Sequence, residues 1–306
     1  MNKKILIATE KPFAPAAVEQ MKEVAAAKSY EIVLLEKYKD KQELIDAVAD
    51  VDAMVIRSDK ATKEVLEAGK NLKIVVRAGA GYDNIDLEAA TEKGIVAMNT
   101  PGQNSNAVAE LALGMMIYMA RGQYNGKAGT ELKGKRLGIH AYGNVGKIVA
   151  TIAKGFGMEV LAFDPFVEKT QIEADGVKVV NSVEELYSNS EYISLHIPAN
   201  DKTKKSINAT LMNVMPENGT IINTARKEVV CEDSLKKVLS QRDDFKYASD
   251  IAPDCAAELV SFENKFYATP KKMGAQTAEA NINAGVASID QIINFLENGD
   301  ITFKVN

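Results

Sequence analysis

Strand-length apolar runs alternate with helix-length segments along almost the whole chain. The expected strands are residues 4–8, 31–35, 51–56, 72–76, 95–98, 136–140, 159–163, 192–196, 220–223 and 247–251. The segments expected as helices between and after them include 15–27, 41–49, 105–120, 145–156, 183–188, 209–214, 233–240 and 277–297. Near-continuous β-branched strands separated by helices are typical of parallel sheets that are covered on both faces. The pattern therefore predicts a doubly wound α/β protein.

The length of the chain and one turn-forming segment indicate that these strands and helices form two domains. A chain of 306 residues is long enough for about two domains, since one domain commonly takes roughly 100–200 residues. The turn-forming segment Asn99-Thr100-Pro101-Gly102 interrupts the alternation and predicts a boundary near residue 100.

Charge and cysteine content exclude several classes of protein. The chain carries 37 Lys and Arg against 42 Asp and Glu, so its net charge of −5 gives no global attraction to nucleic acid or anionic membranes. Cys231 and Cys255 are too few for a disulfide framework or a cysteine zinc site. The apolar run at residues 5–8 is too short for a signal peptide, and the run at 111–120 is too short for a membrane span. We therefore expect a cytoplasmic protein that contacts neither nucleic acid nor membrane.

A glycine-containing segment joins the expected strand 136–140 to the expected helix 145–156. Its letters are GIHAYGNVG, which matches the dinucleotide fingerprint G-x-G-x-x-G with Ala141 in place of the first glycine. Gly143 would let the backbone approach a pyrophosphate, and Gly146 would let the helix pack close to the strand. The amides of Asn144 and Val145 would then face the phosphates from a helix N-terminus. Alanine fits the first position if its φ is negative.

An acidic residue follows at the spacing that this fingerprint needs. Asp164 ends the expected strand 159–163 and lies 18 residues beyond Gly146. A carboxylate there accepts hydrogen bonds from the ribose hydroxyls and repels a 2′-phosphate, which favours NAD over NADP. The alternative is a tight strand–helix turn followed by a solvated aspartate.

Several segments outside the glycine loop are more specific than the loop itself. They read VIRS at 55–58, RAGAGYDNID at 77–86, NTPG at 99–102, VAE at 108–110, SLHIP at 194–198 and INTAR at 222–226. With these segments the chain resembles the D-isomer-specific 2-hydroxyacid dehydrogenases over nearly its whole length, and among them most of all those that act on D-3-phosphoglycerate. The resemblance implies two Rossmann- or flavodoxin-like domains with a substrate cleft between them. Residues 1–99 plus 284–306 would bind substrate, residues 100–283 would bind NAD, and the protein would be a homodimer through the NAD-binding domain.

The resemblance also implies a set of site residues. Arg226 would orient the substrate and contact the cofactor, because a guanidinium can hold a carboxylate and a keto oxygen together. Backbone N–H groups of Gly79, Ala80 and Gly81 would bind the same carboxylate. Arg57 and Lys60 are candidates for a substrate phosphate, although a solvated charge is an equal alternative for each. Arg77 is a weaker candidate, and Ser58 is a further substrate contact. Further cofactor contacts would be Ala80, Tyr142, Ile197, Thr224, Ala225, Asp250, Gly274 and Ala275.

The acid–base pair departs from the pattern of the relatives, which carry a histidine before Gly-Ala-Ser-Thr. The segment here reads TPKKMGAQT at 269–277. If Gly274 is aligned with the glycine of the family motif, Lys272 stands where the relatives have the histidine. If Pro270 is aligned with the proline of the relatives instead, Lys271 stands there. The partner carboxylate falls on Asp254 or on Cys255, and we favour Asp254. A lysine with its ordinary pKa near 10.4 is an acid for reduction and must lose its proton to serve oxidation. The alternative is that Lys271 and Lys272 are solvated loop residues and that the enzyme has impaired activity.

Only two histidines occur, and neither falls at the family position. His140 precedes the glycine loop and is expected in the core, whereas His196 either packs or contacts the cofactor. The leading hypothesis is NAD-dependent oxidation of D-3-phosphoglycerate, a phosphorylated hydroxy acid, in serine biosynthesis. Reduction of hydroxypyruvate, glyoxylate or another 2-keto acid is the enzymatic alternative. A non-catalytic NAD(H)-binding sensor or scaffold is the alternative from another class.

Overall fold

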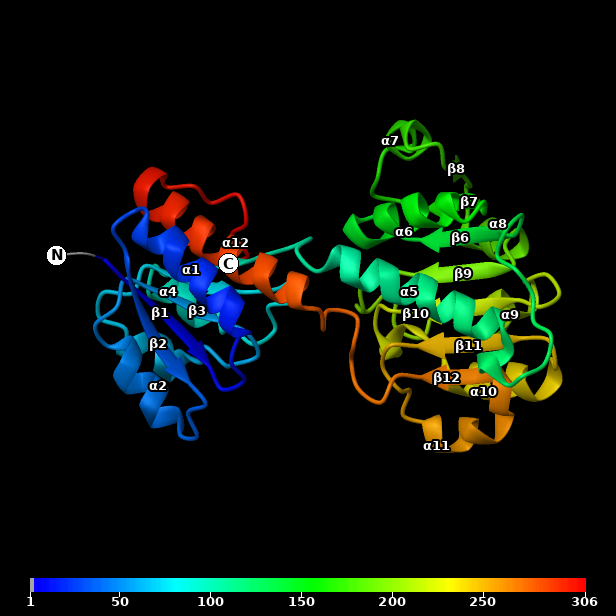
Figure 1. Ribbon diagram of the computed structural model, residues 1–306, viewed down its shortest axis with the longest axis horizontal. Coiled ribbons are helices and arrows are strands. Elements are labelled where there is room, and N and C mark those ends of the chain that lie inside the picture. Colours follow the sequence, from blue (N-terminus) through cyan, green and yellow to red (C-terminus); the bar gives the residue numbers. More distant parts are fainter. Residues whose placement is uncertain (1–2) are drawn as a thin grey trace. The chain divides into compact units, whose positions relative to one another are not determined.

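The computed structural model describes residues 3–306, and the chain forms two compact units (Figure 1). Unit 1 comprises the chain up to Asn104 together with Thr277–Asn306, and unit 2 comprises Ser105–Gln276. Both units are parallel sheets with helices in the crossover connections, which confirms the predicted α/β class. No helix in the described part of the chain is long and apolar enough to span a bilayer.

Unit 1 is built on a five-stranded parallel sheet in the order β2-β1-β3-β4-β5, the flavodoxin-like order. Its strands are β1 (Lys4–Thr9), β2 (Glu31–Glu36), β3 (Ala53–Ile56), β4 (Ile74–Arg77) and β5 (Val96–Asn99). Its helices are α1 (Pro15–Ala26), α2 (Lys41–Val48), α3 (Lys63–Ala68), α4 (Leu87–Glu92) and α12 (Ala278–Asn298).

The last helix returns the chain to unit 1, where α12 lies against α1 (Figure 1). The contact is close, since a Cβ on Gly285 would approach Met21 Sδ to 2.7 Å. The helix begins behind the N-cap Thr277, whose side chain accepts a hydrogen bond from Ala280 N, and all of α12 belongs to this unit. The division therefore falls before residue 277 rather than at the expected 284. The other division falls at the start of α5, after residue 104 rather than 99.

Unit 2 is built on a seven-stranded parallel sheet in the order β12-β11-β10-β9-β6-β7-β8. Its strands are β6 (Arg136–His140), β7 (Glu159–Phe163), β8 (Lys178–Val179), β9 (Tyr192–Leu195), β10 (Thr220–Asn223), β11 (Lys246–Ser249) and β12 (Phe266–Ala268). Its α-helices are α5 (Ser105–Ala120), α6 (Asn144–Gly155), α7 (Lys169–Ala174), α8 (Val183–Ser188), α9 (Ala209–Asn213), α10 (Glu232–Gln241) and α11 (Ala256–Leu259). Short 3₁₀ segments are η1 (Gly122–Tyr124), η2 (Lys227–Val229) and η3 (Val260–Lys265).

The strand order of unit 2 reverses between β6 and β9. In open α/β sheets, ligands bind beyond the carboxyl ends of the strands at such a reversal. Two apolar clusters cover the two faces of the sheet, one including residues of α5 and α6 and the other residues of α8, α9 and α10. These cores fix the strand ends, and with them the loops that follow β6, β7, β9 and β10.

Candidate cofactor and active site

The loop after β6 leaves the N-terminus of α6 open. Gly143 is the N-cap of α6, and no side chain caps the helix there. A Cβ built on Gly143 would meet nothing within 4 Å, whereas one on Gly146 would lie 2.5 Å from Ala141 O. Gly146 thus permits close packing, and the space beside Gly143 lies next to amides at the positive end of the helix dipole. This space and its donors fit a pyrophosphate.

Ala141 has a φ of +81°, so the condition under which alanine fits this position, a negative φ, is not met. The turn from β6 into α6 needs the left-handed region, and the Ala141 N–H donates to Phe163 O at 2.9 Å in that conformation. A Cβ in this region costs roughly 1 kcal/mol relative to glycine.

We therefore expect Ala141→Gly to raise the free energy of unfolding of unit 2 by about 0.5–1 kcal/mol, because it relieves this strain. Urea unfolding followed by circular dichroism measures the change. Ala174→Gly, at an exposed helical position in α7, is the matched control and should lower the same quantity by a similar amount. A loss of stability in Ala141→Gly would contradict the assignment of strain.

Asp164 connects the glycine loop to the loop after β7. Its Oδ2 accepts from Tyr142 N at 2.7 Å and its Oδ1 from Phe166 N at 2.8 Å. Each carboxylate oxygen keeps a second lone pair that suits a ribose hydroxyl. The Tyr142 side chain, by contrast, is fully buried and donates from its hydroxyl to Asp175 Oδ2 at 3.0 Å. Any contribution of Tyr142 to a cofactor site is therefore from its backbone.

Two neutral histidines lie at the ends of β6 and β9. The His196 N–H donates to His140 O at 3.0 Å, and the ring nitrogen Nε2 of His196 lies 2.9 Å from Ser194 Oγ. The ring of His140 makes edge contacts with Phe163 and Tyr187. Burial lowers the pKa of His140 to about 4 and that of His196 to about 3. Both rings are uncharged at neutral pH, so they fit the interior of the strand edge rather than proton transfer.

The neighbouring strand end offers a polar atom without a protein partner. Thr224 follows β10 and is 8% exposed, and its Oγ1 has no hydrogen-bond partner among the described residues. A buried hydroxyl of this kind fits a ligand that lies against it. Ile197, which follows β9 and was also predicted to contact the cofactor, is buried.

Arg226 projects from a loop that its neighbours hold in place. The Asn223 side chain accepts from Ala225 N at 3.0 Å and donates to Arg226 O at 2.9 Å. The Arg226 side chain itself is exposed, with Nη1 donating to Ala225 O at 3.0 Å. A fixed backbone that carries an exposed guanidinium suits the binding of a carboxylate.

Asp254 is tied to the same loop. Its Oδ1 forms an ion pair with Lys227 Nζ, and Glu232 accepts from Asp254 N at 2.8 Å and from Cys255 N at 2.9 Å. Burial raises the pKa of the Cys255 thiol to about 12, so Cys255 does not supply a negative charge at neutral pH. Lys227 and Glu232 were missed at the sequence level, because exposed charged residues are common and nothing in their spacing marks them.

Lys271 and Lys272 are both exposed and precede the buried Gly274. The carboxylate of Asp250, at the end of β11, accepts from the amides of Met273 and Gly274. Asp250 thus holds the backbone of the lysine segment, and the cofactor contact that the resemblance implies for it stays a prediction.

In unit 1, the loop after β4 is held by its neighbours. Gly79 has a φ of +143°, and a Cβ there would collide with Arg77 Nη1, so this position requires glycine. Gly79 N donates to Thr100 Oγ1 at 2.6 Å, and Ala80 O accepts from Asn99 Nδ2 at 2.6 Å. The Gly79 N–H is thus used within the protein, which leaves the amides of Ala80 and Gly81 as the candidates for a substrate carboxylate.

The Arg57 guanidinium donates several hydrogen bonds to other residues of unit 1. Its guanidinium lies 4.9 Å from the Phe13 ring, and it donates to the carbonyls of Lys11 and Pro12 and to Asn281 Oδ1. Burial lowers its pKa. The structure therefore gives Arg57 a connecting role between the 11–13 loop and α12. The neighbouring candidates Ser58 and Lys60 are exposed.

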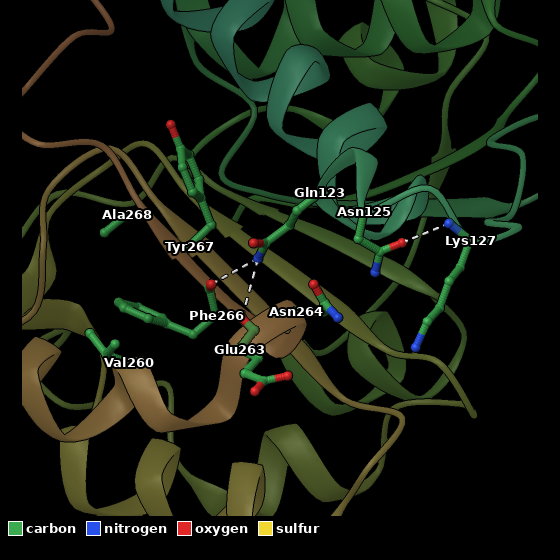
Figure 2. Close-up of a pocket in the computed structure, with 9 residues that line it drawn as sticks. All are labelled: Gln123, Asn125, Lys127, Val260, Glu263, Asn264, Phe266, Tyr267 and Ala268. Atoms are coloured by element: carbon green, nitrogen blue, oxygen red, sulfur yellow. Dashed lines mark hydrogen bonds between the residues drawn. The ribbon is translucent and has the colours of Figure 1, made fainter.

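Unit 2 also contains a hollow of about 590 Å³ (Figure 2). It lies at the edge strand β12, where Gln123 Nε2 donates to Phe266 O at 2.9 Å and to Glu263 O at 3.4 Å. Its described lining is Gln123, Asn125, Lys127, Val260, Glu263, Asn264, Phe266, Tyr267 and Ala268. This lining includes none of the residues predicted for cofactor or substrate, so the hollow is separate from the candidate site.

The sheet reversal, the glycine loop and Asp164 together define a dinucleotide-binding unit of an oxidoreductase. Comparison with known proteins makes this specific: residues 103–271 match the model of the D-isomer specific 2-hydroxyacid dehydrogenase NAD binding domain. The chain belongs to this family and is an NAD-dependent enzyme.

Three similar proteins are relevant to the question of which substrate the enzyme uses. A 3-phosphoglycerate dehydrogenase of Entamoeba histolytica, solved with NAD⁺ bound, is 45% identical with a TM-score of 0.87, covering 100% of this chain and 99% of that one. Thermotoga maritima hydroxypyruvate reductase is 36% identical, with 86% of this chain and 90% of that protein covered. Methanocaldococcus jannaschii D-3-phosphoglycerate dehydrogenase is 37% identical over 82% of this chain, which spans 51% of that protein.

Proposed function

We propose that the protein oxidises D-3-phosphoglycerate to 3-phosphohydroxypyruvate with NAD, as a cytoplasmic enzyme of serine biosynthesis. The observation that carries the proposal is the exposed guanidinium of Arg226 on a fixed loop of the NAD-binding unit. The full-length similarity to the 3-phosphoglycerate dehydrogenase of Entamoeba histolytica supports the choice of substrate. A non-catalytic NAD(H) sensor has no evident chemical need for this arginine.

The reaction divides between a few side chains. NAD held by the glycine loop and Asp164 would supply the hydride acceptor for the substrate carbon. Arg226 holds the substrate carboxylate and the oxygen that becomes the keto group. Lys272 accepts the hydroxyl proton during oxidation and returns it during reduction. Asp254, paired with Lys227, is the carboxylate beside the Arg226 loop.

Oxidation or reduction of an unphosphorylated substrate is the second candidate. One observation favours it: the guanidinium of Arg57, a predicted phosphate ligand, is engaged by Lys11, Pro12 and Asn281. The similarity to the hydroxypyruvate reductase of Thermotoga maritima points the same way. The two candidates differ in whether a phosphate on the substrate is recognised.

We expect NADH-dependent reduction of 3-phosphohydroxypyruvate to exceed that of hydroxypyruvate by at least about tenfold in kcat/KM. Charge-assisted hydrogen bonds to a phosphate contribute roughly 1.5–3 kcal/mol each, and about 1.4 kcal/mol is tenfold. Lys60→Ala should reduce this ratio and leave the rate with hydroxypyruvate unchanged. Equal rates with the two substrates in the unaltered protein would refute the phosphoglycerate assignment.

We expect NADPH to be a poor substitute for NADH, because the Asp164 carboxylate would face the 2′-phosphate. Steady-state kinetics with each cofactor measure the preference. Asp164→Ala should reduce the preference for NADH over NADPH, mainly by weakening the binding of NADH. Comparable efficiency with NADPH in the unaltered protein would show that Asp164 lies outside the ribose site.

We further propose a homodimer through the NAD-binding unit, as the family resemblance implies. Tyr124 and Val260 support an interface there, because their side chains in unit 2 are 65% and 69% exposed. Val260 also lines the hollow at the edge of β12 (Figure 2). Exposed large apolar side chains beside a concave surface are typical of sites where proteins associate.

A further inference from the structure

Glu232 is an acidic residue in the first turn of α10, and its carboxylate contacts the loop that carries Asp254. Its Oε1 accepts from Asp254 N at 2.8 Å, and its Oε2 accepts from Cys255 N at 2.9 Å. These two amides flank the Cα of Asp254. Because charge-assisted hydrogen bonds are stronger than neutral ones, the pair fixes the backbone from which the Asp254 side chain extends.

The helix that carries Glu232 is packed against the segment that follows Asp254. The inner face of α10 is buried, and it shares a core cluster with Leu259 of α11. Lys236, which lies one helical turn beyond Glu232 and on the same face, pairs with Glu258 of α11 at 3.2 Å. Glu232 therefore extends from a helix whose position relative to this loop is already fixed by packing.

The segment that leads into α10 also holds the Asp254 side chain. Lys227 follows Arg226 directly, and its Nζ forms an ion pair with Asp254 Oδ1. The hydrogen bond and the charge of Asp254 raise the pKa of Lys227, so the ammonium keeps its proton at neutral pH. One continuous stretch, residues 226–232, thus carries the exposed guanidinium at its start and binds Asp254 at two points.

We propose that Glu232 is a positioning residue, which holds the backbone of Asp254 so that its carboxylate stays beside the Arg226 loop during proton transfer. The proposal rests on the proposed function, in which Asp254 is the partner carboxylate of Lys272. Glu232 acts through Asp254 and does not itself contact the substrate. Displacement of a catalytic group by about 1 Å costs on the order of 10²-fold in rate.

Glu232→Gln tests this role with little change in size. A carboxamide has one acceptor oxygen, so one of the two loop amides loses its partner. We expect kcat for keto-acid reduction to fall by about 10–10²-fold. The KM for the keto acid should change by less than about threefold, because Asn223 holds the Arg226 loop independently of Glu232. Hydrogen exchange read by mass spectrometry should show faster exchange at Asp254 and Cys255.

Asp233→Asn is the matched control. Asp233 lies in the same first turn of α10, so this change removes the same charge from the helix N-terminus, but its side chain is exposed and pairs with Lys236. It should leave kcat and the exchange of the 254–255 amides unchanged. A similar loss of kcat in Asp233→Asn would overturn the proposal, because the helix charge rather than the two hydrogen bonds would then be responsible. Glu232→Asp keeps the charge on a shorter side chain and should show a milder loss of kcat even if Glu232→Gln folds poorly.

The double variant Asp254→Asn/Glu232→Gln separates positioning from other roles. If Glu232 acts through Asp254, the double variant should be within about threefold of Asp254→Asn in kcat. A multiplicative loss, or a kcat in Glu232→Gln equal to that of the unaltered protein while Asp254→Asn is impaired, would overturn the positioning role alone. Full turnover in Asp254→Asn would instead refute the role of Asp254 in the proposed function, and the positioning role with it.

Discussion

Lys272→Ala should lower turnover by about 10²–10⁴-fold in both directions, the usual range for a positioned general acid or base. The Kd for NADH should change little, because the predicted pyrophosphate and ribose contacts lie at Asn144, Val145 and Asp164. Lys271→Ala is the matched control: it removes an adjacent exposed lysine and should have a milder effect. Turnover like that of the unaltered protein in Lys272→Ala would contradict the role.

The pH profile tests the same assignment independently. Oxidation needs the neutral amine, so its rate should rise with pH through the lysine's pKa in the complex, and reduction should fall over the same interval. Lys272→His should restore part of the activity and move this interval toward the histidine value near 6.5. An unmoved interval in Lys272→His would point to another proton donor, such as Lys271.

The main elements of the fold were predictable from the sequence because short apolar runs alternate regularly with helix-length segments. The strands that became β1, β6, β7 and β10 are buried and rich in branched side chains. The short strands β8 and β12 were not predicted. β12 has only three residues, each partly exposed, so pairing with β11 rather than its own pattern makes it a strand. Isolated short segments carry too little periodicity to be recognised.

The candidate site was predictable where spacing carried the signal. The placement of Gly143, Gly146 and Asp164 follows from the strand–loop–helix order, and the structure shows them in that order. The φ of Ala141 was not predictable, because the path from β6 to α6 dictates it rather than the side chain. The bond between Arg57 and Asn281 joins residues 224 positions apart, a separation at which local pattern says nothing.

The ion pair between Lys227 and Asp254 was hidden for a similar reason. The two residues lie on different loops, 27 positions apart, and meet only because β10 and β11 are neighbours in the sheet. The family resemblance favoured Asp254 as the partner carboxylate, but it gave no indication of the cation beside it. Which charged residue pairs with a site residue therefore depends on which strands are neighbours in the folded sheet.

Acid should destabilise unit 2 steeply, because His140 is buried and the ring of His196 is largely shielded from water. In the folded protein the pKa of His140 is about 4 and that of His196 about 3, against roughly 6.5 in an unfolded chain. Above pH 6.5 both states hold the rings neutral, and no pH dependence arises from them. As the pH falls below 6.5, both imidazole rings bind protons in the unfolded chain but stay neutral in the folded protein. The free energy of unfolding therefore decreases. By pH 4 the loss is about 3 kcal/mol for each histidine.

Urea unfolding at pH 7 and pH 4.5 measures this loss, and variants assign it. His140→Leu should remove about half of the histidine contribution, since Phe163 and Tyr187 already surround the ring with apolar surface. His196→Asn removes the other half while it keeps a polar group near Ser194 Oγ. Carboxylates that titrate in this range contribute equally to the variants and the unaltered protein, so they cancel in the difference. An identical pH dependence in all three proteins would show that the rings are already solvated in the native state.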